Sequence, residues 1–358
     1  MQMIENDIDF YRSEQEHIKN CLKYIVPPKK IVDSEGKLSK FNDVTVSTTT
    51  VIALTNLKID LDRFFQLVPI TDHTPLEKKR GRKPCFNREG PEAQIPFGSI
   101  LLAQKRRDFR GSYMKGKTKK SQTYFLHSVT VVLSLNNNKI VNIKVSSNGK
   151  FQITGCKSSE HYTQTIIALF NVLRQIELMT GERVYSFQKI DEETSIDKLH
   201  VVFNTVMQNM DFHIGFAICR VKLDTFINNH TDFTSIFEGS IGTGVNIKVP
   251  SESDSYDTLM SISYDPLNKS CFLKSEEIKV NQLEVPFSRY SKFLEDKEKK
   301  KDIKKKKHHT FLVFASGSVI MSSRGPDMER VFYKLIETLL KHRSQFEDKN
   351  NKSSFYIE

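Results

Sequence analysis

The amino-acid sequence predicts an α+β fold built from two similar halves, each an antiparallel sheet covered by helices. Residues 141–178 and 310–343 share one plan of strand, tight turn, strand and long helix. Upstream of each, residues 46–70 and 201–227 both show a β-branched or apolar strand followed by a short helix. Because a duplicated pattern of this kind sets the architecture of a whole chain, we predict two structural repeats.

The matches divide the chain into two repeats, each interrupted by an insertion of biased composition. The first insertion is basic, and the second is polar and rich in serine and lysine. In chain order we expect an N-terminal extension with helical structure (1–43), the first repeat (44–185) with its insertion (near 72–124), a linker (186–199), the second repeat (200–345) with its insertion (near 250–308) and a C-terminal tail (346–358).

Each repeat contains a predicted hairpin. Asn148-Gly149 is a strong signal for a two-residue turn in the first. The second, TFLVFASGSVIMSS at 310–323, turns at Ser316-Gly317 and has apolar residues on both faces. One face carries Phe311, Val313, Val319 and Met321, and the other carries Leu312, Phe314 and Ile320. Either the hairpin is buried in protein on both sides, or its second face binds another molecule.

A long helix follows each hairpin and can cover one of its faces. The first helix is expected to begin near Ser158 or Ser159 and to end at Gly181, and the second follows Pro326, a favoured first-turn residue. Helical spacing puts apolar residues on one face of each: Tyr162, Ile166, Leu169, Leu173 and Ile176 in the first, and Met328, Val331, Phe332, Leu335, Ile336, Leu339 and Leu340 in the second.

The charge of the chain favours a polyanionic partner. The formal net charge is +11, and lysine or arginine side chains that meet phosphates release condensed counterions. The basic residues cluster at 78–84, 105–120 and 297–307, in segments expected to be mobile loops or tails. Generic solubility is the alternative explanation.

Arg80-Gly81-Arg82 in the first cluster resembles an AT-hook, whose Arg-Gly-Arg core lies in the narrow minor groove of A·T-rich DNA. Lys83 displaces the usual proline to Pro84, so a nuclear-localisation-like or solvated loop fits the segment about as well.

Other function classes are disfavoured. The five cysteines are far apart and never in a CxxC pair, so neither a disulfide framework nor a zinc site is indicated. No apolar run is long enough to span a membrane and the N-terminus is too polar for a secretory signal, so we expect an intracellular protein without membrane association. His308-His309 beside a lysine run favours a flexible loop, and no phosphate loop or nucleophile elbow is found, so neither a cofactor nor catalysis is expected.

Three short motifs resemble the TATA-binding protein family. FASGSVIMSS and NGKFQITGCKS are similar to the hairpin that closes each half of that fold, and MQNM at 207–210 is similar to the strand that opens its second half. The order of elements is similar over roughly residues 44–345. The two long loops and VSTTTVIALTNLKIDLD resemble the divergent TATA-binding-protein-like factors of large cytoplasmic DNA viruses.

This resemblance implies a saddle, in which a curved antiparallel sheet carries helices on its convex face and DNA on its concave face. Leu312, Phe314 and Ile320 would then face the minor groove. Phe314 matches an aromatic wedge, and Phe237, followed by Gly239, matches its partner. Asn209 matches a residue that bonds minor-groove acceptors, and Thr154 and Ser322 match positions against the groove floor.

The first half departs from the family pattern. Its wedge position is Ser146, its asparagine position is Thr48, and Lys144 and Gln152 lie on the face expected to be concave. Phe97 is a candidate for the partner wedge, in competition with Phe125. The polar face implies hydrogen bonding and phosphate attraction, and we do not expect a symmetric double kink.

The resulting expectation is a transcription initiation factor that binds double-stranded, A·T-rich promoter DNA and bends it. By resemblance its protein partners would be a general-transcription-factor-B-like protein and RNA polymerase. A viral protein of this kind would act in the host cytoplasm, at the viral factory, or be carried in the virion, and a cellular one would act in the nucleus. A protein-interaction scaffold, or a non-catalytic nucleic-acid-binding module of a larger complex, is the alternative.

Overall fold

The computed structural model describes residues 31, 40–72, 95–111, 127–189, 197–241, 243–251, 256–279, 308–323 and 327–349. Most of the predicted N-terminal extension, the basic clusters at 78–84 and 297–307, and the tail beyond residue 349 lie outside these residues. Arg80, Arg82 and Phe125 are therefore not described.

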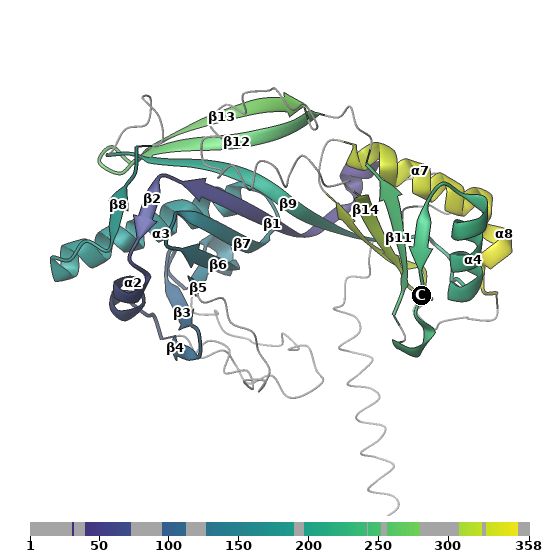
Figure 1. The fold of residues 1–358 in the computed structure, drawn as a ribbon, viewed down its shortest axis with the longest axis horizontal. Coiled ribbons are helices and arrows are strands. Elements are labelled where there is room, and N and C mark those ends of the chain that lie inside the picture. The colour runs from purple at the N-terminus through teal and green to yellow at the C-terminus, as the bar shows by residue number, and fades with distance from the viewer. Residues whose placement is uncertain are drawn as a thin grey trace, which may run out of the picture.

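One antiparallel sheet joins both halves of the molecule (Figure 1). The first half contributes β1 (Thr45–Thr55), β3 (Ile100–Lys105), β4 (Asp108–Arg110), β5 (Ser128–Ser134), β6 (Ile140–Ser146) and β7 (Lys150–Cys156). The second contributes β9 (Leu199–His213), β10 (Thr234–Ile236), β11 (Val245–Pro250), β14 (His308–Val313) and β15 (Ser318–Ser323). A separate small sheet pairs β2 (Leu57–Ile59) with β8 (Tyr185–Phe187).

The strand order reads the same way in both directions from the β1–β9 seam. The first half continues through β7, β6, β5 and β3, and the second through β15, β14, β11 and β10. In each half the closing hairpin lies next to the opening strand, and the strands that follow the short helix lie outermost. The predicted α+β fold with two repeated halves is therefore confirmed.

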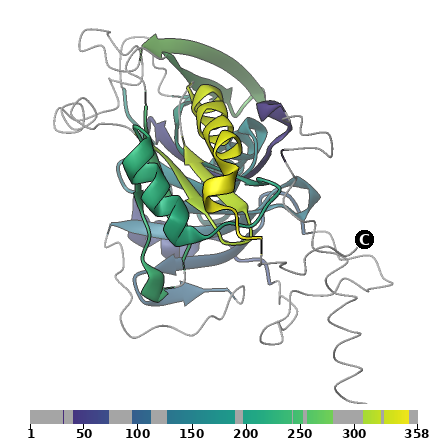
Figure 2. The same ribbon diagram turned by 90° about the vertical axis from the view of Figure 1, so that its right-hand side faces the viewer.

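Helices cover one face of each half. The short helices are α2 (Leu61–Leu67) and α4 (Arg220–His230), and the long ones are α3 (Ser159–Thr180) and α7 (Met328–Lys341), with α8 (Arg343–Phe346) after α7. Single turns of 3-10 helix occupy η1 (Phe41–Asp43), η2 (Asn136–Asn138) and η3 (Gly239–Ile241). Seen from the end of the second half, α4 and α7 lie in front of their strands (Figure 2).

The long helices have the ends and faces that the sequence predicts. Ser158 is the N-cap of α3, and Gly181 ends it in the left-handed conformation. One face of the second hairpin packs under α7, and each of its side chains is at most 1% exposed: Phe311, Val313, Val319 and Met321. The first half has an equivalent core, in which Phe151 and Ile153 of β7 belong with the apolar face of α3.

Both hairpin turns require glycine. Gly149 and Gly317 have φ angles of 76° and 89°, values that residues with a Cβ atom rarely adopt. A Cβ on Gly317 would also lie 1.9 Å from the carbonyl oxygen of Phe216. Both turns predicted from the sequence are thus present.

Parts of both predicted insertions belong to the sheet. The segment near 72–124 supplies β3 and β4, and β3 pairs with β5. The segment near 250–308 supplies β12 (Tyr256–Asp265) and β13 (Ser270–Lys279), and β12 pairs with the first five residues of β9. This hairpin lies along the upper edge of the molecule in Figure 1.

His308-His309 does not lie in a loop, which corrects the sequence interpretation. Both residues are in β14, and the period of the strand puts His309 on the buried face together with Phe311 and Val313. The lysine run that suggested a loop ends directly before the strand.

Candidate nucleic-acid interface

The face of the sheet opposite the helices, which we call the open face, carries the predicted site residues that lie on the central strands and on the closing hairpins of the two halves. At the seam Thr48 pairs with Asn209, and Asn209 pairs with Ser322 on its other side. The Ser322 hydroxyl donates to Oδ1 of Asn209 at 2.8 Å. This bond fixes the amide so that Nδ2, a donor, remains as the group that Asn209 presents to a ligand.

The open face of the second half is apolar beside this seam. Leu312 and Ile320 lie directly opposite each other in the β14–β15 pair, and Phe314 follows at the turn. All three side chains are partly exposed, whereas their neighbours on the other face are buried. An exposed apolar row on a sheet is typical of a binding surface.

Phe237 is held beside η3 by a cation–π contact. The Arg220 guanidinium lies 4.9 Å from the centroid of the Phe237 ring, and the same guanidinium donates to the carbonyl oxygen of Thr243 at 2.6 Å. The ring is partly buried against the core of the second half, and Gly239 begins η3 two residues later. Arg220 therefore orients the ring, a role that the sequence motif did not reveal.

The open face of the first half is polar. Lys144 of β6 lies opposite Gln152 of β7 and Thr130 of β5, and Thr154 lies opposite Asn142. The residues on either side of Lys144 and Gln152 are buried in the core. Ser146, at the predicted wedge position, ends β6 and is partly exposed. The two halves therefore place different chemistry on equivalent strands.

Phe97 lies just before β3, and 44% of its surface is exposed. The adjacent Gly98 has a φ angle of 81°. Phe97 is thus on the surface of the outermost part of the first half, as Phe237 is near the outermost strands of the second.

Two members of the basic cluster at 105–120 serve the fold. Lys105 forms an ion pair with Asp62 in α2. Arg110 donates to the carbonyl oxygens of Phe65 and Gln66 near the end of the same helix, each at 2.7 Å. Cations near a helix C-terminus satisfy its unpaired carbonyls. Of this cluster, residues 112–120 lie outside the described residues.

A buried Ser-His-Asp set lies under the start of α7. Nδ1 of His309 contacts the Ser323 hydroxyl, its Nε2 lies 3.0 Å from Oδ2 of Asp327, and the Ser251 hydroxyl donates to Asp327 at 2.8 Å. His309 and Asp327 side chains are only 1% and 2% exposed. Such burial withholds these groups from substrates, and the set joins β14, β15 and α7.

The described residues include three free cysteines, Cys156, Cys219 and Cys271, of which Cys156 is buried. No group of histidine, cysteine or acidic side chains there has the arrangement of a metal site. Burial raises the pKa of Cys156 to about 11, so its thiol stays protonated near neutral pH. No helix among the described residues is long and apolar enough to cross a membrane.

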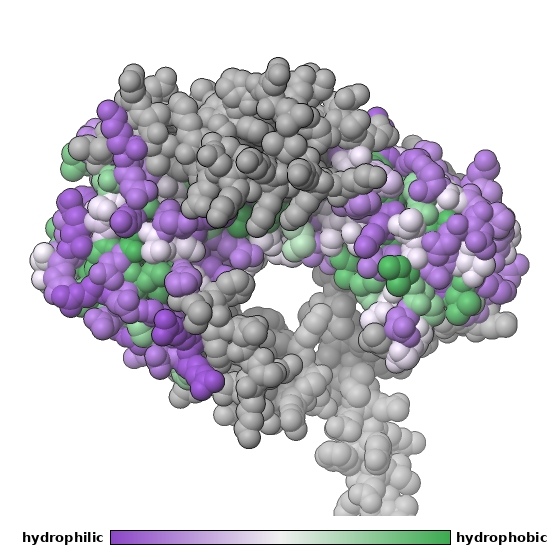
Figure 3. Space-filling view, in the orientation of Figure 1, coloured by the Kyte–Doolittle hydropathy of each residue, from purple (hydrophilic) through white to green (hydrophobic). Residues whose placement is uncertain are grey.

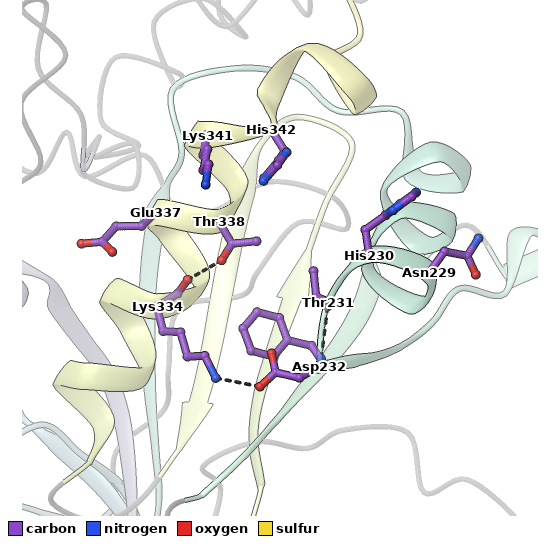
Figure 4. Close-up of a pocket in the computed structure, with 10 residues that line it drawn as sticks. Asn229, His230, Thr231, Asp232, Lys334, Glu337, Thr338, Lys341 and His342 are labelled. Atoms are coloured by element: carbon purple, nitrogen blue, oxygen red, sulfur yellow. Dashed lines mark hydrogen bonds and ion pairs between the residues drawn. The ribbon is translucent and has the colours of Figure 1, made fainter.

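The helix side carries a cavity of about 690 Å³ between the ends of α4 and α7 (Figure 4). Lys334 lies 2.8 Å from Asp232 and 5.1 Å from the centroid of the Phe233 ring. The hydrogen bond from Lys334 holds the pKa of Asp232 below its ordinary value. His230, Lys341 and His342 also line this cavity. Elsewhere the visible surface of both halves is mostly hydrophilic, with small hydrophobic patches (Figure 3).

Comparisons with known proteins agree with the hairpin motifs. No family model matches the chain. An uncharacterised protein, 335L, of Invertebrate iridescent virus 6 is 28% identical over 231 residues, which cover 63% of this chain and 62% of that protein. A TATA-box-binding protein-like protein of Acanthamoeba polyphaga mimivirus is 25% identical over 209 residues, which cover 56% of this chain and 50% of that protein. The alignments thus span 50% to 62% of the length of these relatives.

Among solved structures, Methanococcus jannaschii TBP matches with 11% identity and a TM-score of 0.36, over 84% of this chain and 98% of that one. These values are too low to add to the description of the fold. The similarity to the mimivirus protein agrees with the resemblance noted in the sequence: the chain is similar to a divergent TATA-binding-protein-like protein.

Proposed function

We propose that the chain is a DNA-binding transcription initiation factor whose open face contacts the minor groove of A·T-rich promoter DNA. The observation that carries the proposal is the second hairpin. Its apolar residues occur on both faces, α7 buries one set, and Leu312, Phe314 and Ile320 remain partly exposed beside the amide of Asn209. The mimivirus relative is described as TATA-box-binding-protein-like.

The chemistry of the seam suits the floor of an A·T-rich minor groove. Adenine N3 and thymine O2 are hydrogen-bond acceptors, and A·T and T·A pairs present no donor there. Asn209 presents its amide N–H groups because Ser322 bonds its oxygen. Thr48, opposite Asn209, supplies a smaller hydroxyl at the equivalent position of the first half.

In the second half, Phe314 and Phe237 would act as wedges. Apolar side chains inserted between base steps unstack them and kink the duplex, which lets more protein surface touch DNA; TATA-binding protein is itself the standard example of this mode. Leu312 and Ile320 would cover the sugar and base edges between the wedges.

In the first half, Lys144, Gln152, Thr154 and Ser146 would attract phosphates and form hydrogen bonds without intercalation. Phe97 remains a candidate wedge at the outer end of this half. The proposed complex is therefore asymmetric, with most of the bend in the part of the DNA that the second half contacts.

The helix side would stay accessible in such a complex. The cavity between α4 and α7 is on that side, and a general-transcription-factor-B-like protein or RNA polymerase is the proposed partner class for it. Both sequence relatives are viral proteins, so the proposed place of action is the host cytoplasm.

A protein-interaction scaffold is the second candidate. It is favoured by Asp211, an acidic residue on the open face that does not suit contact with phosphates. In this case the apolar row would hold a protein segment in place of DNA.

Fluorescence anisotropy with labelled duplexes separates the two candidates. We expect tighter binding to A·T-rich than to G·C-rich duplexes. Between about 50 and 200 mM salt, the logarithm of the affinity should fall linearly with the logarithm of the salt concentration. The Phe314→Ala variant, with Glu329→Gln on α7 as a control, should weaken binding while the control does not. If no duplex binds with a salt-dependent affinity, the scaffold is the better account.

A further inference from the structure

Asp211 is the one acidic side chain that the pairing register places in the apolar row of the second half, among the residues the structure describes. It lies directly opposite Ile320 of β15 and Thr45 of β1. Its neighbours Met210 and Phe212 are buried in the core under α7. Because successive strand residues point to opposite faces, the Asp211 carboxylate is on the open face.

Within the described residues, no cation or hydrogen-bond donor is paired with this carboxylate. On the same face of β9, Asn209 bonds Ser322. On the other side, His213 accepts from the backbone N–H of Gly215 through Nδ1 at 2.9 Å, and its Nε2 bonds the carbonyl oxygen of Ser316 at 2.8 Å. Both ring nitrogens of His213 are thus engaged in holding the turn.

A carboxylate in this position selects for one feature of DNA. Ionised carboxylates only accept hydrogen bonds. In the minor groove, A·T and T·A pairs offer only acceptors, whereas a G·C pair adds a donor, the exocyclic N2 amine of guanine. With an A·T pair beneath Asp211, the carboxylate would face only other acceptors and could form no hydrogen bond with the bases. With a G·C pair, it would accept a hydrogen bond from the guanine N2 amine.

We propose that Asp211 reads the guanine N2 amine, so that the second half requires a G·C pair at one position beside the A·T pairs read by Asn209. This inference rests on the proposed function, and it adds a base preference that the resemblance does not contain. Two residues of one strand, Asn209 and Asp211, would then distinguish A·T from G·C in opposite senses.

Inosine provides the direct test, because an inosine·C pair lacks the N2 amine but is otherwise close to G·C in the minor groove. Each A·T pair of a bound duplex is replaced singly by G·C and by inosine·C, and affinities are measured by anisotropy. For the wild type we expect one position at which G·C binds about tenfold more tightly than inosine·C.

The variant Asp211→Asn should reduce that ratio to about twofold or less, because an amide can donate to the acceptors of an inosine·C pair as well as accept from the guanine N2 amine. Glu329→Gln, which removes the same charge from the exposed first turn of α7, should leave the ratio unchanged. Equal tightening of Asp211→Asn on every duplex would show that Asp211 only repels phosphates, and would overturn the inference while leaving the proposed function intact. A wild type that binds no duplex would overturn both.

Discussion

The two halves of the sheet have the same strand order, but the side chains on their open faces differ in polarity. In the second half Leu312, Phe314 and Ile320 are apolar, whereas the matching strands of the first half carry Lys144 and Gln152. Their buried faces are alike, since α3 and α7 each cover a closing hairpin with apolar side chains. Packing therefore constrains one face of each repeat, and the other face is free to acquire a separate binding chemistry.

The largest effect on stability should come from the buried faces, which are alike in the two halves. Phe151→Ala and Phe311→Ala should each lower the free energy of unfolding by about 3–5 kcal/mol, because both side chains are fully buried. Phe314→Ala, on the open face of the same hairpin as Phe311, should change it by about 0.5 kcal/mol or less. Chemical denaturation measures all three, and a large loss for Phe314→Ala would place that ring in the core.

The next effect concerns bending and separates the two open faces. Phe314→Ala should reduce the bend because it removes a wedge, while Ser146→Phe should increase it by adding one to the polar half. Fluorescence transfer between the ends of a labelled duplex reports the bend, and melting curves check that both variants fold. Unchanged bending in Phe314→Ala, together with a lower melting temperature, contradicts the assignment of the open face.

The salt dependence of DNA binding should depend more on the polar open face of the first half than on the apolar open face of the second. Lys144→Gln should reduce the slope of log affinity against log salt by about 0.9, the value for one lost phosphate contact. Leu312→Ala should weaken binding with the slope unchanged. Neutralising the lysines and arginines of any one basic segment, 78–84, 105–120 or 297–307, should lower this slope equally for all DNA sequences. An unchanged slope would show that the segment does not contact phosphates.

The smallest effect is expected from an exposed ion pair in each half. Lys105 with Asp62 links the end of β3 to α2, and Lys334 with Asp232 links α7 to the segment after α4. Double-mutant cycles should give about 0.2–1 kcal/mol for each pair, since the carboxylate of each pair is largely exposed to solvent. A coupling well above this range in only one half would reveal a difference in rigidity that burial does not show.

Local signals made much of the fold predictable. Gly149 and Gly317 identified both turns, Ser158 and Gly181 bounded α3, and the period of apolar residues identified both buried faces. The β12–β13 hairpin and β3 were not separated from the insertions around them, because the polar and basic flanks dominate the composition of those segments.

The site was predictable only where a motif carried it. The motifs suggested Asn209, Ser322 and Thr48, and the structure brings these three together at the seam. Asp211, two residues along β9, belongs to no motif, and its position on the open face follows from the strand register. His309 was missed because the adjacent lysines obscured the alternation that begins at residue 309.

The pairing of β9 with β1, and of β12 with β9, also determines when the first half can complete its core. Val201 and Phe203 of β9 and Ile262 and Tyr264 of β12 belong to the same apolar cluster as α3, although all of them follow the linker. During synthesis the first repeat therefore leaves the ribosome before the residues that cover its edge have been made. Contacts between such distant segments close long loops and form slowly. A nascent chain that ends at the linker exposes an apolar surface, so translation of the second repeat is part of the folding of the first.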